Sequence, residues 1–424
     1  MSSSLPAPFQ DIRTGSGPAR RVAGHDGVAA GEPSQHGLHH PDASRPVAEP
    51  SDRLFHHALF EIPETVCYLD GAAYSPLPRG VRAAGEHGIL SKSQPWAHPA
   101  ARGDAVAEHA RALAAHLVGA SPDDIAILGS VSQGIATAAR NLALKPGHRL
   151  IRMAAEFPSQ SLIWDRLAAE RSVLPEIVER PADGDWTAAL RAAITRPGAP
   201  PVTVAALTPL HWSDGALADL DILAPLLRAQ GAAIVVDATQ AAGVIPIDVA
   251  ALQPDFLAFP AYKWLLGPFG LGFLYAAPHR QDGLPLDENN NNRPGGIPAP
   301  GARRYDKGER NDPILLPMAS AGMELVLGWG VGAVAAHLRL LTDRLARDAA
   351  ALGLEVLPPH LRAPHILGVR LPGGMPAGLL DALAAGGVHC SDRLGVLRVS
   401  PHVWCREGDL DRFRDVLRRA LAGG

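Results

Sequence analysis

The sequence predicts an α/β fold in which helices cover a mostly parallel β-sheet. From Leu54 onward, short apolar and β-branched runs alternate with Ala- and Leu-rich segments of helical period. The length of 424 residues is enough for a large domain and a smaller one. We therefore expect a leader at residues 1–53, a large domain at 54–300 and a smaller C-terminal α+β domain at 301–424.

Five strands and four helices of the large domain can be placed from these patterns. Open sheets of parallel strands bind ligands beyond the carboxyl ends of the strands. The residues that follow each strand are therefore the first place to look for a site. The expected strands are 124–128, 202–207, 233–237, 256–259 and 272–275, and the expected helices are 104–118, 133–142, 163–170 and 222–230.

The smaller domain is expected to begin with a single long helix over residues 318–352. Strands at 366–371 and 396–399 and a closing helix at 408–421 follow it. The segment 287–301 contains four consecutive asparagines and an Arg-Pro-Gly-Gly run, and this composition predicts a loop.

Composition narrows the class of function. The chain has 39 basic and 43 acidic residues, so no excess of positive charge indicates a nucleic-acid partner. No apolar run reaches the roughly 20 residues of a membrane-spanning helix. The cysteines, Cys67, Cys390 and Cys405, lack the spacing of a metal site. The residues before position 50 are polar and lack a secretory apolar segment, which predicts a disordered leader. We expect a cytoplasmic enzyme that acts on small molecules.

One lysine, Lys263, stands in an otherwise apolar and glycine-rich segment, PAYKWLLGPFGLGFLY. A lysine is rarely buried unless its charge is compensated or its proton is removed. Asp237 ends the apolar run AAIVVD, and Lys263 follows the next predicted strand, so both side chains are expected at neighbouring strand ends. They form either a buried ion pair or two parts of a cofactor site.

Pyridoxal phosphate needs such a pair of residues. A lysine amine forms a Schiff base with the cofactor, and a carboxylate keeps the pyridine nitrogen protonated. The segment GSVSQGIATAARNL, residues 129–142, adds a phosphate site, because helix amides and the hydroxyls of Ser130 and Ser132 can bind an anion. Serine is also a common helix N-cap. Only together with Asp237 and Lys263 does this segment predict a site for pyridoxal phosphate.

The segment that runs from VVDATQAAG to PAYKWLLGPFGLGFLY, with its D-x-x-Q and K-x-x-x-G-P-x-G elements, resembles the class V aminotransferase-like enzymes of fold type I. This group includes cysteine desulfurases, kynureninases and serine–glyoxylate transaminases. The likeness extends from YLDGAAYSPLP to RVSPHVWCREGDLDRF. It implies a mostly parallel, seven-stranded sheet, pyridoxal 5'-phosphate as cofactor and an amino acid as substrate. It also implies a homodimer in which the loop at 303–313 reaches the partner subunit's phosphate.

The resemblance assigns roles to residues around the cofactor. Lys263 is implied to form the Schiff base and to move the proton at Cα. Asp237 is implied to pair with the pyridine nitrogen, and Gln240 to hydrogen-bond the ring hydroxyl. Val131 and Ser132 match the positions of the phosphate loop.

Further positions match the family in part. Phe157 occupies the place of a ring that stacks on the cofactor, although it could be an ordinary core residue. Asp214 is either a polar residue near the ring oxygen or a turn residue. Tyr262 is implied to donate to the phosphate, and Pro260 replaces a serine that many relatives use there. Arg398 is implied to bind the substrate α-carboxylate.

The reaction is less specified than the cofactor. Cys390 lies only eight residues before Arg398, closer than the loop cysteine of a desulfurase, and the local pattern resembles the kynureninase type. Arg393 and His402 are additional candidates for the substrate site. We predict an aminotransferase, with a C–C or C–S lyase as the alternative and a cysteine desulfurase or an epimerase as less favoured activities.

Overall fold

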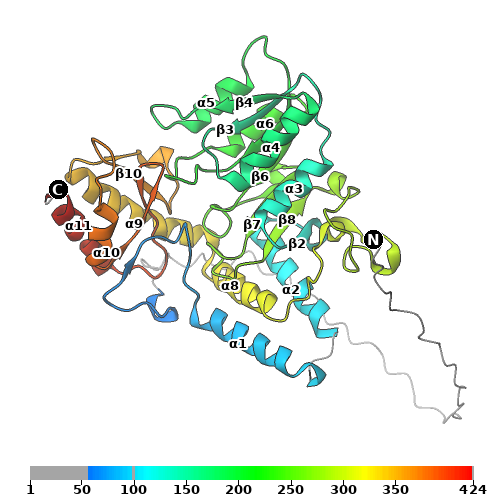
Figure 1. Cartoon of the computed structure of the whole chain (residues 1–424), viewed down its shortest axis with the longest axis horizontal. Coiled ribbons are helices and arrows are strands. Elements are labelled where there is room, and N and C mark those ends of the chain that lie inside the picture. Colours follow the sequence, from blue (N-terminus) through cyan, green and yellow to red (C-terminus); the bar gives the residue numbers. More distant parts are fainter. Residues whose placement is uncertain (1–55, 98–100, 423–424) are drawn as a thin grey trace, which may run out of the picture. The chain divides into compact units, whose positions relative to one another are not determined.

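The computed structural model describes residues 56–97 and 101–422 and has the predicted α/β architecture (Figure 1). Its largest sheet has seven strands in the order β2-β8-β7-β6-β5-β3-β4, and only β8 runs antiparallel to its neighbours. The predicted leader, residues 1–53, lies outside the described residues. The strands are β2 (Ile125–Leu128), β3 (Arg149–Met153), β4 (Leu174–Val178), β5 (Val202–Leu207), β6 (Ala233–Asp237), β7 (Phe256–Pro260) and β8 (Gly272–Ala276).

Helices cover both faces of this sheet because its strands are apolar on both sides. In β2, for example, Ile125 and Ile127 join one buried cluster, whereas Ala126 and Leu128 join the cluster on the opposite face. The first face packs against α2, α5 and α6, and the second against α3 and α4. The helices of this part are α2 (Ala101–Val118), α3 (Val131–Asn141), α4 (Pro158–Arg171), α5 (Trp186–Ile194), α6 (Leu220–Arg228) and α7 (Val249–Leu252).

The C-terminal part contains a four-stranded antiparallel sheet in the order β12-β13-β10-β9. Strand β1 pairs in parallel with β11, so the segment that begins at His56 contributes to this part of the molecule. The division at residue 300 stays a prediction. The remaining elements are β1 (Cys67–Tyr68), α1 (Arg79–Ser93), α8 (Leu315–Trp329), α9 (Val331–Ala351), β9 (Glu355–Val356), β10 (Leu367–Arg370), α10 (Leu379–Ala385), β11 (Val388–His389), β12 (Ser391–Arg393), β13 (Val396–Val399) and α11 (Glu407–Ala422).

The prediction of one long helix over residues 318–352 is wrong. Two helices, α8 and α9, occupy this stretch and are bent by 77° at their junction. Gly330 forms the junction with φ 83° and ψ 120°, a conformation that side chains disfavour and glycine tolerates. Among the described residues, no single helix is long and apolar enough to cross a membrane, and only this bent pair, taken together, has both the length and the composition.

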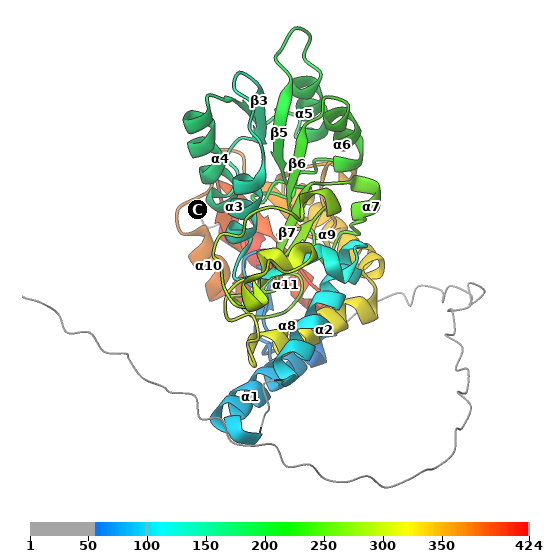
Figure 2. The ribbon, with the colours of Figure 1, turned by 90° about the vertical axis from the view of Figure 1, so that its right-hand side faces the viewer.

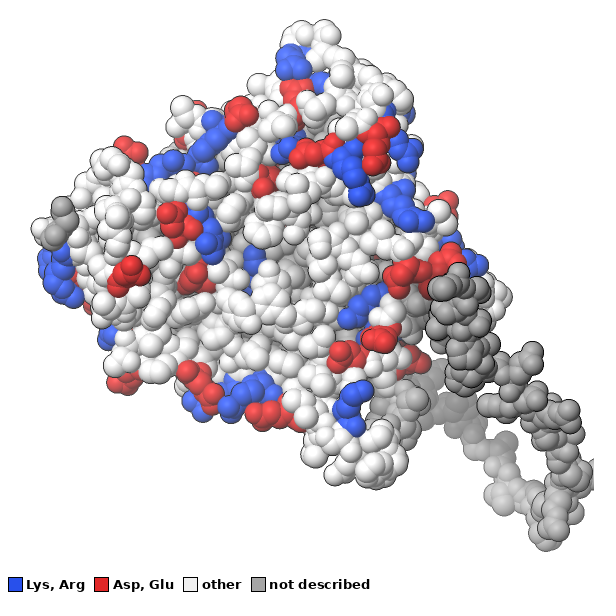
Figure 3. Space-filling model, in the orientation of Figure 1, with Lys and Arg blue, Asp and Glu red and all other residues white. Residues whose placement is uncertain are grey.

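Charged side chains of both signs are interspersed on the described part of the face in Figure 3. Neither the basic nor the acidic side chains form a continuous patch over any one helix or strand in this view. The distribution agrees with the near balance of 39 basic and 43 acidic residues in the chain.

Helix α8, which runs beside α1 and α2 (Figure 2), contacts the backbone of the loop that follows Lys263. A Cβ atom on Gly322 would lie 2.2 Å from the carbonyl oxygen of Leu265 and 3.2 Å from the carbonyl carbon of Leu266. Only a glycine at position 322 therefore allows this close approach, and α8 supports the loop that follows Lys263.

We expect Gly322→Ala to lower the free energy of unfolding by about 1–3 kcal/mol, because the added methyl group forces the loop away from the helix. Gly328→Ala, on the same helix, is the matched control, since no atom lies within 4 Å of its Cβ position. That control should be stabilising by about 1 kcal/mol through helix propensity. Denaturant unfolding of the two variants measures the difference. Equal effects would contradict the close approach.

Candidate active site

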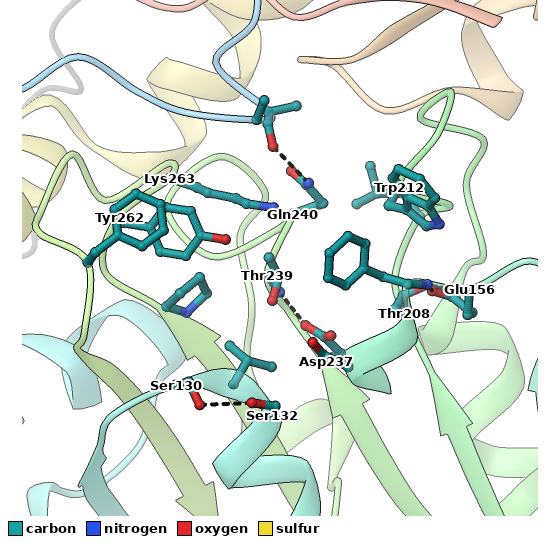
Figure 4. A pocket seen from close by; sticks show the side chains of 18 of the residues that line it. Ser130, Ser132, Glu156, Thr208, Trp212, Asp237, Thr239, Gln240, Tyr262 and Lys263 are labelled. Atoms are coloured by element: carbon teal, nitrogen blue, oxygen red, sulfur yellow. Dashed lines mark hydrogen bonds between the residues drawn. The ribbon is translucent and has the colours of Figure 1, made fainter. Parts of the chain in front are cut away.

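A pocket of about 600 Å³ opens at the carboxyl ends of the central strands (Figure 4). Segments that follow β2, β5, β6 and β7 line it, as expected for an open α/β sheet. Strands β12 and β13 of the C-terminal sheet close another side. The predicted site residues found together in its lining are Ser130, Val131, Ser132, Phe157, Asp237, Gln240, Tyr262, Lys263 and Arg398.

Lys263 extends into this pocket and makes no hydrogen bond with any residue that the structure describes. Burial, together with the positive charges of Arg398 and Arg393, lowers the pKa of its amine to about 8, and the charge of Asp237 opposes this shift. The aromatic ring of Tyr262 lies beside the amine, with 5.6 Å between Nζ and the ring centroid. The amine therefore loses its proton at a pH more than two units below the ordinary value of 10.5.

Asp237 lies at the end of β6 and is buried. Its Oδ1 accepts a hydrogen bond of 2.9 Å from the backbone N–H of Thr239. Burial raises the pKa of the carboxyl group, while hydrogen bonds from Thr239 and the charge of Lys263 counteract it. Within the described residues no cation lies within 4 Å of this carboxylate, so the simple ion pair with Lys263 is not formed.

The phosphate-loop residues form the N-terminus of α3. Ser130 is the N-cap, and its Oγ accepts a hydrogen bond from the backbone N–H of Gln133. The hydroxyls of Ser130 and Ser132 are 2.9 Å apart. These hydroxyls and the free amides of the first turn lie in the lining of the pocket. The arrangement suits a phosphate group.

Gln240 is held in place by three contacts. Its Nε2 donates to the carbonyl oxygen of Ala72 at 3.1 Å, and its Oε1 accepts from Nε1 of Trp264 at 2.8 Å. Its backbone oxygen lies 2.6 Å from Nε2 of His365, a buried residue of the C-terminal part. One amide hydrogen of the side chain remains available for a ligand.

Aromatic rings form the walls of the pocket. Phe157, the N-cap of α4, packs edge to face against Trp212 with ring centroids 5.5 Å apart. On another side, Tyr262 stacks on Phe269 at 3.9 Å. Phe157 is 48% exposed, so it is a pocket residue and not an ordinary core phenylalanine.

Arg398 is buried on β13 with its guanidinium partly unpaired. Nη2 donates to Asp70 at 3.2 Å and Nη1 donates to the carbonyl oxygen of Trp212 at 3.0 Å. Nε is buried without a hydrogen-bond partner among the described residues. Burial lowers the pKa of the group to about 10. The missing acceptor fits a carboxylate from a ligand.

Two candidates lie outside the lining. Asp214 is buried, but its carboxylate pairs with Arg180 and lies 3.5 Å from Arg370. Its Oδ1 also accepts the N–H of Ala216, which is the behaviour of a turn residue. His402 is enclosed between the rings of Trp264 and Trp404. The structure does not bring either side chain to the other predicted site residues.

Glu156 is a pocket residue that the sequence reasoning missed. Its Oε1 accepts a hydrogen bond of 2.7 Å from the Thr208 hydroxyl, and its Oε2 accepts one of 3.2 Å from the backbone N–H of Phe157. Burial, together with the charge of nearby Asp237, raises the pKa of the carboxyl group to about 7, and the hydrogen bond from Thr208 opposes this shift. Its position directly before the predicted stacking residue was the available signal.

No cysteine contributes to the described lining. Burial raises the pKa of Cys390 to about 12, and the charge of Asp70 contributes. This thiol is therefore a poor nucleophile. Within the described residues, no group of three or more His, Cys, Asp or Glu side chains is placed to hold a metal ion.

The pocket fits pyridoxal phosphate. It holds an amine without a hydrogen-bond partner, a buried carboxylate on a neighbouring strand and a helix N-terminus with two hydroxyls. The buried Nε of Arg398 adds an unsatisfied donor for the carboxylate of a substrate.

The lowered pKa of Lys263 predicts a pH dependence of cofactor capture. Only the unprotonated amine attacks an aldehyde, so the rate should rise with pH and level off above about 8. Rapid mixing of cofactor-free protein with pyridoxal phosphate, followed by near-visible absorbance, measures this rate. Lys263→Arg should give no band, whereas Lys92→Arg, an exposed control, should behave as wild type. A midpoint near the ordinary value of 10.5 would contradict the burial of the amine.

The raised pKa of Glu156 predicts that Glu156→Gln becomes relatively more stable as the pH rises. The wild-type carboxyl group favours folding below the unfolded value of about 4.5, and this contribution is lost as the pH rises through about 7. The difference should reach about 3 kcal/mol at most. Thermal unfolding of cofactor-free protein across this range measures it. Exposed Glu355→Gln is the control and should show no such trend. A difference that does not change with pH would refute the assignment.

Comparison with known proteins places this site in a family. The family model described as aminotransferase class V matches residues 67–292. The chain is 29% identical to isopenicillin N epimerase from Streptomyces clavuligerus, over 85% of this chain and 96% of that protein. It is also 29% identical to the uncharacterized aminotransferase YcbU from Bacillus subtilis, over 70% and 79%.

Solved structures share the fold. The cysteine desulfurase CsdA from Escherichia coli, in its S-sulfonic acid form, superposes with a TM-score of 0.75 at 23% identity, over 86% of this chain and 97% of that chain. The family model covers more than half of the 424 residues, including Asp237 and Lys263. The protein therefore belongs to the class V aminotransferase family of pyridoxal-phosphate-dependent enzymes.

Proposed function

We propose that this protein is an aminotransferase that acts on an amino acid. The observation that carries the proposal is the convergence of three groups in one pocket, namely the amine of Lys263 with a pKa of about 8, the carboxylate of Asp237 and the partly unpaired guanidinium of Arg398. Bound pyridoxal phosphate supplies an electron sink for the electron pair left when a bond to Cα breaks. The remaining requirements are met by side chains of this chain.

Each group has a distinct task in this proposal. Arg398 binds the α-carboxylate, and fixing that group selects the Cα bond that is broken. Lys263 Nζ takes the proton from Cα and then donates it to a different atom. A pKa near the working pH is suitable for a group that both accepts and donates a proton. Asp237 holds a proton on the pyridine nitrogen, and Gln240 donates its remaining amide hydrogen to the ring hydroxyl.

The other pocket residues position the cofactor. Ser130, Ser132 and the amide of Val131 bind the phosphate, and Tyr262, which also lines the pocket, donates its hydroxyl to the same group. Phe157 stacks on the ring and presents only carbon atoms to it. Lys263 is the base for both proton transfers in this proposal.

An epimerase is the second candidate. Similarity to isopenicillin N epimerase extends over 96% of that protein and 85% of this chain. An epimerase would return the proton to the opposite face of Cα and would leave the amino group on the substrate. A cysteine desulfurase is disfavoured because the thiol of Cys390 is held protonated.

We also propose a cytoplasmic homodimer. Three free cysteines, two of them buried, are consistent with a reducing compartment. Tyr74 and Phe269, which are 55% and 48% exposed, contact each other at 4.8 Å beside the pocket. Such exposed aromatic rings are typical of an interface that a second subunit covers.

A half-reaction experiment tests the proposed function. Holoenzyme mixed with a panel of L-amino acids, without a keto acid, should lose the absorbance of the lysine-bound cofactor and release one equivalent of keto acid per site. Lys263→Ala should abolish the change, and Arg398→Gln should weaken it by roughly tenfold to a hundredfold. Inversion at Cα without keto acid would establish the epimerase instead. A protein that never develops the cofactor band would overturn both activities.

A further inference from the structure

Arg393 brings a second guanidinium to the pocket that the proposed chemistry does not use. In the antiparallel pair β12–β13, Ser391 lies opposite Arg398 and Arg393 lies opposite Val396. Residues two apart on a strand face the same side of a sheet, so Arg393 and Arg398 share a face. Both line the pocket. Diagonal neighbours of this kind have Cβ atoms roughly 7 Å apart.

The two arginines differ in how their charge is compensated. Arg398 has a carboxylate partner in Asp70, which also accepts a hydrogen bond of 2.9 Å from the Ser391 hydroxyl. Arg393 donates through Nη1 to the backbone oxygen of Asp392 at 3.0 Å, and no carboxylate of the described residues lies within 4 Å of its guanidinium. A half-buried guanidinium without a counter-charge is unfavourable unless a ligand supplies one.

Positive charge therefore accumulates at this end of the pocket. The charge of Arg393 lowers the pKa of both Lys263 and Arg398, so the three cations influence one another. Asp70 compensates Arg398 in part. One substrate carboxylate would satisfy the remaining donor of Arg398, and Arg393 would still lack an anion.

We propose that Arg393 binds a second carboxylate at the end of the substrate side chain, so that the enzyme acts on a short acidic amino acid. This inference rests on the proposed function, which assigns the α-carboxylate to Arg398. A guanidinium binds a carboxylate through two parallel hydrogen bonds, and an amide of equal size offers only one acceptor. Two guanidinium groups from diagonal neighbours of one strand pair can each bind one carboxylate of a short dicarboxylate.

Ligand binding to the holoenzyme tests the inference without turnover. Calorimetric titration with glutarate and with butyrate compares a dicarboxylate with a monocarboxylate of similar length. We expect glutarate to bind at least tenfold more tightly, because it engages both arginines. Arg393→Gln should remove this preference and leave the affinity for butyrate unchanged. Arg418→Gln, a loss of charge at an exposed position of α11, is the control and should keep the wild-type preference.

Turnover provides the second readout. Half-reaction rates are compared between L-glutamate and L-glutamine and between L-aspartate and L-asparagine. The two substrates of each pair differ by one charge and have nearly the same shape. Wild type should favour the acids by roughly tenfold to a hundredfold, and Arg393→Gln should abolish the difference. If Arg393→Gln lowered acid and amide rates equally, or lowered the affinity for pyridoxal phosphate, the second carboxylate site would be refuted. Preserved preference for glutarate without any turnover would instead overturn the proposed aminotransferase and keep the dicarboxylate site.

Discussion

The removal of the Lys263 amine from water is the constraint on which the pocket depends. A buried amine favours its neutral form, and the surrounding cations Arg393 and Arg398 strengthen that preference. Asp237 opposes it but does not approach within ion-pair distance. The result is an amine of lowered pKa just beyond the end of β7, in a loop that packs against the backbone of α8 at Gly322.

The carboxylates around this amine have separate environments and therefore separate properties. Asp237 receives hydrogen bonds from Thr239, and Asp70 is fixed between Arg398 and Ser391. Glu156 is satisfied by a hydroxyl and one amide, with no cation of the described residues within 4 Å, and burial raises the pKa of its carboxyl group to about 7.

The sequence was sufficient to predict the central strands, because they are continuous apolar runs whose residues are buried on both faces of the sheet. Asp237 ends one of these runs, and Lys263 follows the next. It was not sufficient for β3, whose sequence RLIRM includes two arginines that are buried through pairing with Glu176 and Asp165, partners remote in the sequence. The bend at Gly330 was missed because the flanking residues favour a helix. The sequence left Asp214 open between a site residue and a turn residue, because spacing does not specify which way a turn directs its side chain.

The anchor at Arg398 is assembled from three distant parts of the chain. Asp70 comes from the N-terminal side, the carbonyl group of Trp212 from the middle and the arginine from the last strand. Gln240 is likewise fixed by His365, 125 residues further along. These contacts have long sequence separations, which slow folding because long loops must close before they form. A chain still emerging from the ribosome therefore lacks the proposed carboxylate anchor until β13 has been synthesised, and this part of the pocket is completed only late in folding.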